Sequence, residues 1–264
     1  MHIVVCVKQV PDSQSVKFDQ NTNVMLREGV ASILNPFDAY AVEEALRLKE
    51  KLGGSITAIS MGPAQAESAL REAIAMGVDK GILVNDPALA GSDAWVTGYV
   101  LALAIRKLGD AGLVICGKQG ADGETAQVGP GIAAHLNVPQ ITYVRKIDEI
   151  DDKHLVAQRL LEEGHEFIDS SLPCVLTVVK EINEPRIASL KGKMAAKKAQ
   201  IVKWTVLDIG ADPAKVGLGG STTKVLKIFA PPARQGGQIF TGEPEQVIGR
   251  LVEQLKDVVT AAAK

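Results

Sequence analysis

Residues 112–130 read GLVICGKQGADGETAQVGP, and they combine an apolar run, a glycine-rich turn and the beginning of a helix. The run at 112–116 is typical of a buried strand, and we expect the helix to end near Leu136. A helix that starts directly after such a turn leaves backbone N–H groups free at its positive end, and phosphate groups bind at such ends. The same glycines would also suit a tight turn without a ligand, so this stretch alone leaves both interpretations open.

The composition is that of an ordinary globular protein. The chain has 264 residues, 46% hydrophobic and 23% charged, which is enough for one large domain or a domain with an appendage. A net charge of −2 and 4% aromatic residues do not favour nucleic-acid binding. The longest mainly apolar stretch, near residues 100–105, is too short to cross a bilayer, and the first residues read as a strand instead of a signal peptide. We therefore expect a cytoplasmic protein without membrane insertion.

The cysteines and histidines do not form a disulfide or metal-binding pattern. The three cysteines, Cys6, Cys116 and Cys174, lie in separate apolar runs, and the sequence has no C-x-x-C pair. The four histidines have no spacing typical of metal ligands. We therefore expect reduced thiols and no metal site.

Strand-like and helix-like segments alternate in the first half of the chain. Apolar runs predict strands at residues 3–8, 55–61, 81–84 and 113–116. Three helices are predicted between them. The first is opened by Asn35-Pro36 and closed by Gly53-Gly54, the second covers residues 64–76, and the third runs from a Ser92-Asp93 cap to about Leu108. This order predicts an α/β fold, with a parallel sheet covered by helices on both faces. In such folds ligands bind beyond the carboxyl ends of the strands. The pieces at these ends are residues 6–9, residues 61–63 and the glycine-rich turn, and residues 35–38 belong to the same edge.

The second half is less regular. Strands are predicted at residues 141–144, 155–160 and 175–179, with a hairpin turn at 162–164. From residue 184 onward we expect a less compact chain, with an exposed loop, a short helix and a lysine cluster at 191–198. A Gly/Pro-rich segment at 231–237 precedes an amphipathic helix at about 244–259, whose apolar stripe must fold back or dock on a partner. We therefore divide the chain into an α/β domain at 1–230 and a C-terminal arm at 231–264. The long polar connection at 11–33 is expected to be functional or part of an interface.

Two late segments carry a family resemblance. The first has the pattern A-x-R-x-x-E-E-G-x-E-x-I at 157–168, followed by P-x-V-L-T at 173–177, and the second reads NEPRIASL at 183–190 with MAAKK at 194–198. Shorter matches are VK at 7–8, NPF at 35–37, AVEEA at 41–45, GPAQ at 62–65 and GKQ at 117–119. In this order, over nearly the whole chain, they resemble the β subunit of electron-transfer flavoproteins.

The resemblance implies an adenine-nucleotide-binding, Rossmann-like α/β domain that pairs with a homologous, flavin-containing α subunit. The nucleotide-binding residues that it implies are Cys6, Asn35, Pro36, Phe37, Asp38, Met61, Gly120, Ala121, Asp122, Gly123, Glu124, Thr125, Ala126, Gln127, Val128, Gly129, Pro130 and Gly131. Most of these belong to the strand-end pieces already named. The resemblance also implies a partner-docking loop at 185–194 with Leu190 as its apolar anchor. A buried Leu190 beneath the loop, with the lysines as a solvated face, is the alternative.

The glycine-rich turn bears on which nucleotide is bound. AMP-binding members of the family have several acidic residues and an Asn-Gln-Thr-Gly-type run here, whereas residues 122–130 read DGETAQVGP and resemble members that bifurcate electrons with FAD in place of AMP. Gly123 removes a side chain and a negative charge beside the expected phosphates, and Pro130 suits a first helical turn that needs no N–H donor. The alternative is that these substitutions arose by neutral drift in a protein that binds AMP.

For bifurcation, the resemblance implies that NADH reduces the FAD of this subunit. One electron then passes to the α-subunit FAD and an acyl-CoA dehydrogenase, and the other passes to ferredoxin or flavodoxin. No catalytic side chain is expected, because the flavin carries the chemistry. Lys8 and Gln9 are candidates to tune it, unless Lys8 is a structural ion-pair member. The alternatives are a single-flavin carrier with structural AMP and, from another class, a homodimeric regulatory module of the universal-stress type.

Overall fold

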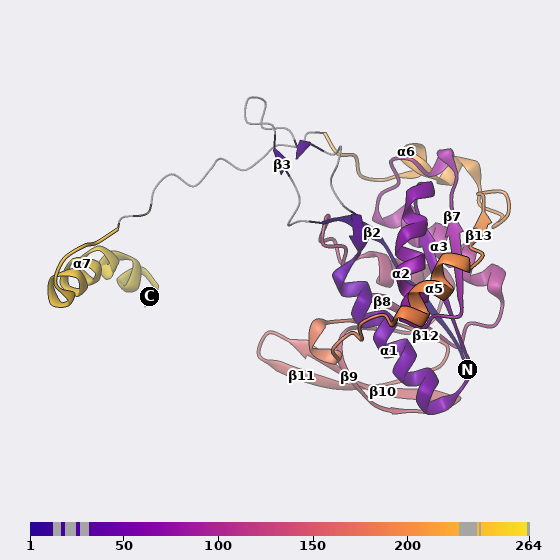
Figure 1. Ribbon diagram of the computed structural model, residues 1–264, viewed down its shortest axis with the longest axis horizontal. Helices are drawn as coiled ribbons and strands as arrows, with labels where there is room; N and C mark the ends of the chain where they lie inside the picture. Colours follow the sequence, from indigo (N-terminus) through magenta and orange to yellow (C-terminus); the bar gives the residue numbers. More distant parts are fainter. Residues whose placement is uncertain (13–16, 19–24, 27–31, 227–236, 238, 263–264) are drawn as a thin grey trace. The chain divides into compact units, whose positions relative to one another are not determined.

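The computed structural model describes residues 1–12, 17–18, 25–26, 32–226, 237 and 239–262 (Figure 1). The chain divides into two compact units, Met1–Ile228 and Phe229–Lys264. Most of the long connection at 11–33, namely residues 13–16, 19–24 and 27–31, lies outside the described residues. Within the described part, no helix combines the length and the apolar character needed to cross a membrane.

A single large sheet forms the centre of the first unit. Among the described residues it has nine strands in the order β11-β10-β9-β12-β8-β1-β6-β7-β13. The parallel part contains β1 (His2–Cys6), β6 (Ser55–Met61), β7 (Lys80–Val84), β8 (Leu113–Gly117), β12 (Cys174–Val178) and β13 (Val202–Trp204). Because the chain passes from β1 to β6 and β7 and then returns to β8 on the other side of β1, the strand order reverses between β1 and β8.

Helices cover both faces of this sheet, so its central strands are apolar on both sides. On one face, α1 (Pro36–Leu52) and α2 (Glu67–Met76) pack over Ile3, Val5 and Ile115. On the other face, α3 (Ala94–Leu108) and α4 (Val128–Leu136) pack over Val4 and Val114. The predicted α/β fold with helices on both faces is therefore confirmed.

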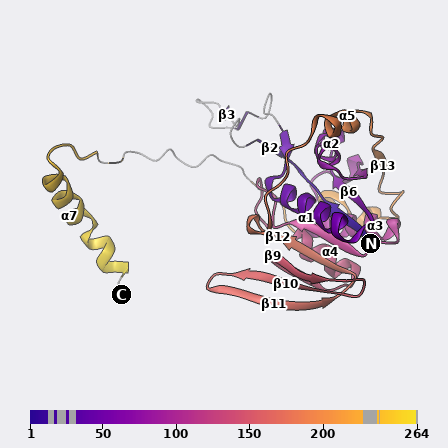
Figure 2. The same cartoon turned by 60° about the horizontal axis from the view of Figure 1, so that its bottom comes forward.

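The strands predicted from the first half of the chain are parallel, as expected, but the second half adds antiparallel strands to the sheet. β9 (Gln140–Ile150) pairs parallel with β12, but β10 (His154–Leu161) and β11 (Gly164–Ser171) continue antiparallel from it (Figure 2). The antiparallel hairpin was signalled by the turn at 162–164. The sequence did not indicate how this hairpin joins the main sheet. β12 follows β11 in the sequence, but it lies between β8 and β9 in space.

The expectation of a less compact chain after residue 184 was wrong up to about residue 216. The short helix exists as α5 (Leu190–Lys198), but Ile201, Val206, Ile209 and Val216 are buried in the two hydrophobic cores. β13 adds a parallel edge strand beside β7. With only three residues, this strand has too short an apolar pattern to be recognised in the sequence. Residues 217–220 form the short helix α6 (Gly217–Gly220).

The remaining elements are small or belong to the second unit. β2 (Gln9–Pro11) pairs with β5 (Ser32–Leu34), and β3 (Lys17–Phe18) pairs with β4 (Met25–Leu26). The second unit contains α7 (Pro244–Ala262), which includes the predicted amphipathic helix. Leu251 and Leu255 of its apolar stripe are exposed to solvent in this chain.

Candidate functional site

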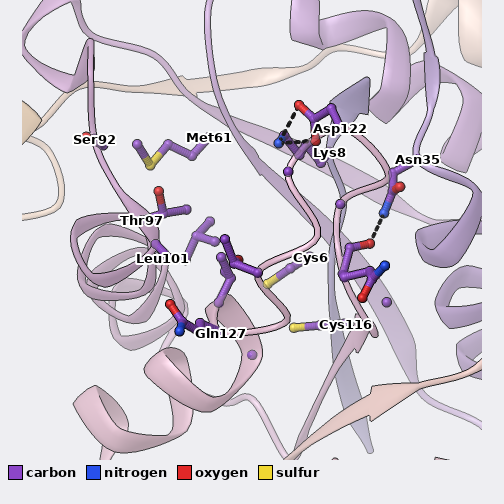
Figure 3. A pocket seen from close by; sticks show the side chains of 18 of the residues that line it. Cys6, Lys8, Asn35, Met61, Ser92, Thr97, Leu101, Cys116, Asp122 and Gln127 are labelled. Atoms are coloured by element: carbon purple, nitrogen blue, oxygen red, sulfur yellow. Dashed lines mark hydrogen bonds and ion pairs between the residues drawn. The ribbon is translucent and has the colours of Figure 1, made fainter. Parts of the chain in front are cut away.

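A cavity of about 460 Å³ opens at the carboxyl edge of the sheet, where the strand order reverses between β1 and β8 (Figure 3). Ligands of open α/β sheets bind in this kind of crevice. The predicted residues that line it are Cys6, Asn35, Asp38, Met61, Gly120 and Asp122–Gly129. Pro36, Phe37, Ala121, Pro130 and Gly131 do not line it, although the first four are each next to a lining residue in the chain.

One wall of the cavity was missed by the sequence analysis. It is formed by Leu89–Ala94, Thr97 and Leu101, from the loop after β7 and the first turns of α3. The signal for it was present, because the predicted strand at 81–84 must end at the same edge as its parallel neighbours. The loop that follows this strand therefore belonged with the other strand-end pieces.

Asn35 holds the glycine-rich turn against the beginning of α1. Its side-chain Nδ2 donates to the Gln119 carbonyl at 2.8 Å, and its Oδ1 accepts from the Ala121 N–H at 3.0 Å. Asn35 does occupy the N-cap position of α1, but its side chain makes no cap hydrogen bond. The predicted position of Asn35 as the cap residue is therefore confirmed, but its side chain does not bond the first turn. A buried amide satisfies two backbone groups of the turn instead.

A second link joins the turn to the end of β1. The Lys8 ammonium donates to both carboxylate oxygens of Asp122, at 2.6 and 2.8 Å. Lys8 is therefore an ion-pair member, as one of the two interpretations proposed, and it also lines the cavity. Gln9 is not a lining residue, because its amide donates to the Gln65 carbonyl and the Ser68 hydroxyl beside α2.

The glycines of the turn have different roles. A Cβ on Gly117 would lie 2.4 Å from Asp38 Oδ1, and one on Gly129 would lie 2.3 Å from Thr177 Cγ2, so both positions require close approach. A Cβ on Gly123 would meet no atom within 4 Å. The packing of this chain therefore leaves room for a side chain at Gly123, and any functional reason for its glycine must come from a ligand.

The backbone of the turn is strained where it meets the cavity. Glu124 and Ala126 have φ values of 50° and 53°, a region that residues other than glycine rarely adopt. Such strain is concentrated at ligand-binding and active sites. The turn ends at α4, whose N-cap residue Gln127 makes no side-chain cap bond. The first N–H groups of α4, at Val128 and Gly129, therefore have no intrahelical partner at the cavity wall.

Two carboxylates also lie at the cavity, the buried Asp38 and the helix-capping Asp93. Asp38 Oδ2 accepts from the Lys8 N–H at 2.7 Å, and burial raises the pKa of Asp38 to about 7, although its hydrogen bonds to Asn35 and to the Lys8 and Gly117 N–H groups oppose this rise. Asp93 caps α3 by accepting from the Val96 N–H at 3.0 Å. Its other oxygen accepts from the N–H groups of Thr222 and Thr223. Because Asp93 occupies the start of α3, the start of α4 is the better place for an anion.

A separate feature is the exposed apolar surface of the loop and helix at residues 187–194. Leu190 is 77% exposed, and Ile187 and Met194 are also exposed. The alternative of a buried Leu190 is therefore wrong. Four lysines of the same helix are exposed too, namely Lys191, Lys193, Lys197 and Lys198.

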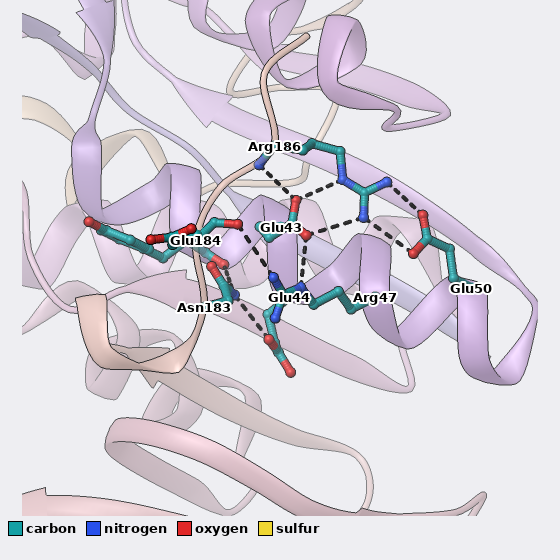
Figure 4. A network of polar contacts seen from close by, with 8 residues as sticks. Glu43, Glu44, Arg47, Glu50, Asn183, Glu184 and Arg186 are labelled. Atoms are coloured by element: carbon teal, nitrogen blue, oxygen red, sulfur yellow. Dashed lines mark hydrogen bonds and ion pairs between the residues drawn. The ribbon is translucent and has the colours of Figure 1, made fainter. Parts of the chain in front are cut away.

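Ion pairs centred on one buried carboxylate, that of Glu43, hold this loop on α1 (Figure 4). The Arg186 guanidinium donates to Glu43 at 2.7 Å and to Glu50 at 2.6 Å, and Arg47 also donates to Glu43 at 2.8 Å. Burial of Glu43 favours the neutral acid, but the two arginines outweigh this effect and lower its pKa. The neighbouring Asn183 donates to Glu44 at 3.0 Å. The exposed Leu190 is thus carried by a firmly attached segment.

The chain is thus an α/β protein with a doubly wound sheet, a cavity at its switch point and an uncapped helix after a glycine-rich turn. Open α/β proteins bind their ligands at this kind of crevice. Comparison with known proteins identifies the family. The family model "Electron transfer flavoprotein domain" matches residues 22–209. The chain belongs to the electron transfer flavoprotein family and is similar to its β subunits over almost its whole length.

Three relatives illustrate this similarity. The electron transfer flavoprotein subunit beta of Thermoanaerobacterium thermosaccharolyticum is 48% identical over 97% of this chain and 98% of its own length. The caffeyl-CoA reductase–Etf complex subunit CarD of Acetobacterium woodii is 47% identical, over 97% and 98%. The protein FixA of Bradyrhizobium diazoefficiens is 43% identical, over 97% and 91%.

Proposed function

We propose that the chain is the β subunit of a heterodimeric, electron-bifurcating electron transfer flavoprotein and that its cavity binds FAD. The observation that carries this proposal is the extent of the cavity. It continues from the polar turn at Gly120–Gln127, across the ends of β1 and β8, to the apolar side chains of Met61, Leu89 and Leu101. Dinucleotides bind across the crevice at a switch point, so a cavity with one polar and one apolar part supports a dinucleotide.

The polar part suits the phosphate groups. The uncapped start of α4 offers N–H groups and a positive helix end, and the Lys8 ammonium lies at the same loop. Gly117 and Gly129 let the backbone pack closely against Asp38 and Thr177, which holds the turn and the start of α4 in place. Gly123 adds neither bulk nor charge, which supports a pyrophosphate in preference to the AMP of the single-flavin members.

Bound FAD would supply the chemistry, namely hydride uptake from NADH and transfer of single electrons. The part of this chain is to bind and orient the cofactor and to keep its cavity closed to water on the side of the sheet. Thr97 and Leu101 on α3, with Met61 at the end of β6, would form the wall against its apolar portion. No side chain of the chain is assigned an acid, base or nucleophile role.

The partners follow from the family and from the exposed surfaces. A β subunit functions with an α subunit, and the unit at Phe229–Lys264, with its exposed Leu251 and Leu255, is proposed to dock on it. The surface around Leu190 is proposed to dock on an acyl-CoA dehydrogenase, because an exposed apolar anchor on a firmly held segment is suited to enter a partner's pocket. One relative is named as a subunit of a CoA-ester reductase complex, which supports this class of partner.

The test is an electron-transfer assay with the chain produced together with its α subunit. We expect NADH to reduce ferredoxin or flavodoxin only when an acyl-CoA dehydrogenase and its CoA-ester acceptor are also present. Transfer to the dehydrogenase with no reduction of either low-potential acceptor would contradict bifurcation and favour the single-flavin alternative, in which AMP is structural.

A further inference from the structure

Two of the three cysteines face each other at the floor of the cavity. Cys6 on β1 and Cys116 on β8 are register partners of neighbouring parallel strands. Both belong to the hydrophobic core on the α3 and α4 face, so their side chains point to the same side of the sheet. Both line the cavity, where their sulfur atoms lie close together (Figure 3).

The backbone spacing at this pair suits a covalent link. Neighbouring strands lie about 4.8 Å apart, and disulfides need Cα atoms roughly 4.4–6.8 Å apart. The thiols are free and hydrogen-bonded to each other, and this bond together with burial holds the pKa of Cys116 well above its usual value. Burial and the contact with Cys6 keep Cys116 in its thiol form, which leaves Cys6 as the attacking sulfur.

We propose that Cys6 and Cys116 form an oxidant-sensitive dithiol, which a peroxide reaching the cavity converts to an intramolecular disulfide. The Cys6 thiolate attacks the peroxide O–O bond, forming a sulfenic acid and releasing hydroxide, which takes up a proton to give water. The Cys116 sulfur then attacks the Cys6 sulfur, and the sulfenic hydroxyl leaves as a second water with the Cys116 proton. One hydrogen peroxide is reduced for each disulfide formed, and both sulfurs are oxidised.

The cavity decides access to this dithiol. Cys6 is 7% and Cys116 is 5% exposed, and their lining position makes the cavity their route to solvent. A ligand in the cavity covers them, and a bridge between them alters the floor on which the ligand rests. The dithiol does not depend on which nucleotide is bound or on bifurcation, so it goes beyond the proposed function.

Cys174 provides a matched control on the same sheet. It is fully buried, pairs with Leu113 instead of another cysteine, and packs in the opposite hydrophobic core. The experiment treats the full chain with hydrogen peroxide and maps cross-linked peptides by mass spectrometry without reduction. We expect a Cys6–Cys116 link in the unchanged chain and in Cys174→Ala, and no intramolecular link in Cys6→Ala or Cys116→Ala.

Two further measurements keep the proposal open to contradiction. Phenylarsine oxide bridges two close thiols with release of water. It should add once to the unchanged chain and prevent the peroxide-induced link, and this test does not require the cysteine variants to fold. FAD and AMP, tested separately, should slow the link if either binds. Links through Cys174, links only between molecules, or oxidation of both thiols without a link would overturn the proposal. A chain that binds neither nucleotide but still forms the link would contradict the proposed function alone.

Discussion

The ammonium of Lys8 lies 2.6 Å from one carboxylate oxygen of Asp122 and 2.8 Å from the other. This contact joins the end of β1 to the glycine-rich turn, two segments that are 114 residues apart in the sequence. The Lys8 side chain is 50% exposed, so the pair adds little to stability. Its position at the cavity suggests a role in holding the turn and attracting phosphate.

Replacement of Lys8 by Met should weaken nucleotide binding without lowering stability much. We expect the affinity for FAD to fall on the order of tenfold to a hundredfold, because a hydrogen bond to a charged group contributes about 1.5–3 kcal/mol. The free energy of unfolding should change by less than about 1 kcal/mol. Titration of flavin fluorescence and thermal unfolding measure the two effects. Lys49→Met, which removes a similar ion pair to Asp79 away from the cavity, should leave the affinity unchanged; an equal loss there would refute the role of Lys8.

Replacement of Asn35 by Ala should loosen the glycine-rich turn. The change leaves the Gln119 carbonyl and the Ala121 N–H without their side-chain partner, at a cost of about 1–3 kcal/mol for each buried group left unsatisfied. Hydrogen exchange should become faster at residues 119–124, and FAD affinity should fall. Asn85→Ala is the control, because Asn85 also bonds a loop carbonyl, that of Gly62, but does not line the cavity. An Asn35→Ala chain with unchanged exchange in the turn would contradict this assignment.

Two glycines of the turn should respond differently to Ala. Gly129→Ala places a Cβ against Thr177 Cγ2 and should destabilise the fold by about 1–3 kcal/mol. Gly123→Ala meets open space, so its effect on unfolding should stay within about 0.5 kcal/mol. Chemical denaturation of both variants checks the contrast. Similar losses of stability in the two variants would show that the packing described for α4 and β12 is incorrect.

Asp38 should make stability depend on pH in an unusual direction. Burial raises the pKa of Asp38 from its ordinary value of 3.8 to about 7 in the folded protein, so the folded state binds the proton more tightly. Its contribution to the free energy of unfolding is therefore greatest below about pH 4, falls as the pH rises through 7, and is constant above that. Asp38→Asn should flatten the profile between pH 5 and 7 in denaturation experiments. The same slope in the variant would show that another group is responsible.

Arg186 should control how firmly the Leu190 segment is attached. Arg186→Met removes its bonds to Glu43 and Glu50 and leaves Glu43 with Arg47. Because Glu43 is buried, we expect a loss of about 1–3 kcal/mol and faster proteolysis within residues 183–190. Lys203→Met, which breaks a more exposed pair with Glu67, should change neither by a comparable amount. Unchanged proteolysis in the Arg186 variant would rule out the anchoring role.

Much of the α/β core was predictable because its strands are apolar runs of five to seven residues. The rule that ligands bind beyond the carboxyl ends of the strands also predicted most of the cavity. The loop after β7, with Leu89–Ala94, follows from the same rule but was not predicted. Asn35 shows a different limit. Its residue type and place suit a helix cap, and only the tertiary contact with the turn determines that its side chain binds Gln119 and Ala121 instead.

Long-range pairing was the least predictable part. The position of β12 between β8 and β9, and of β13 beside β7, depends on which buried strands meet in space, and the local pattern does not encode this. The meeting of Cys6 and Cys116 is of the same kind, because each cysteine is an isolated residue in its own apolar run. Their pairing follows only from the register of β1 and β8.

Whether this cavity holds FAD can be determined from the nucleotide content of the purified heterodimer. The complex is denatured, and the released nucleotides are separated and quantified against protein. We expect two FAD for each heterodimer and no AMP. One FAD together with one AMP would contradict this expectation and assign the cavity to a structural mononucleotide.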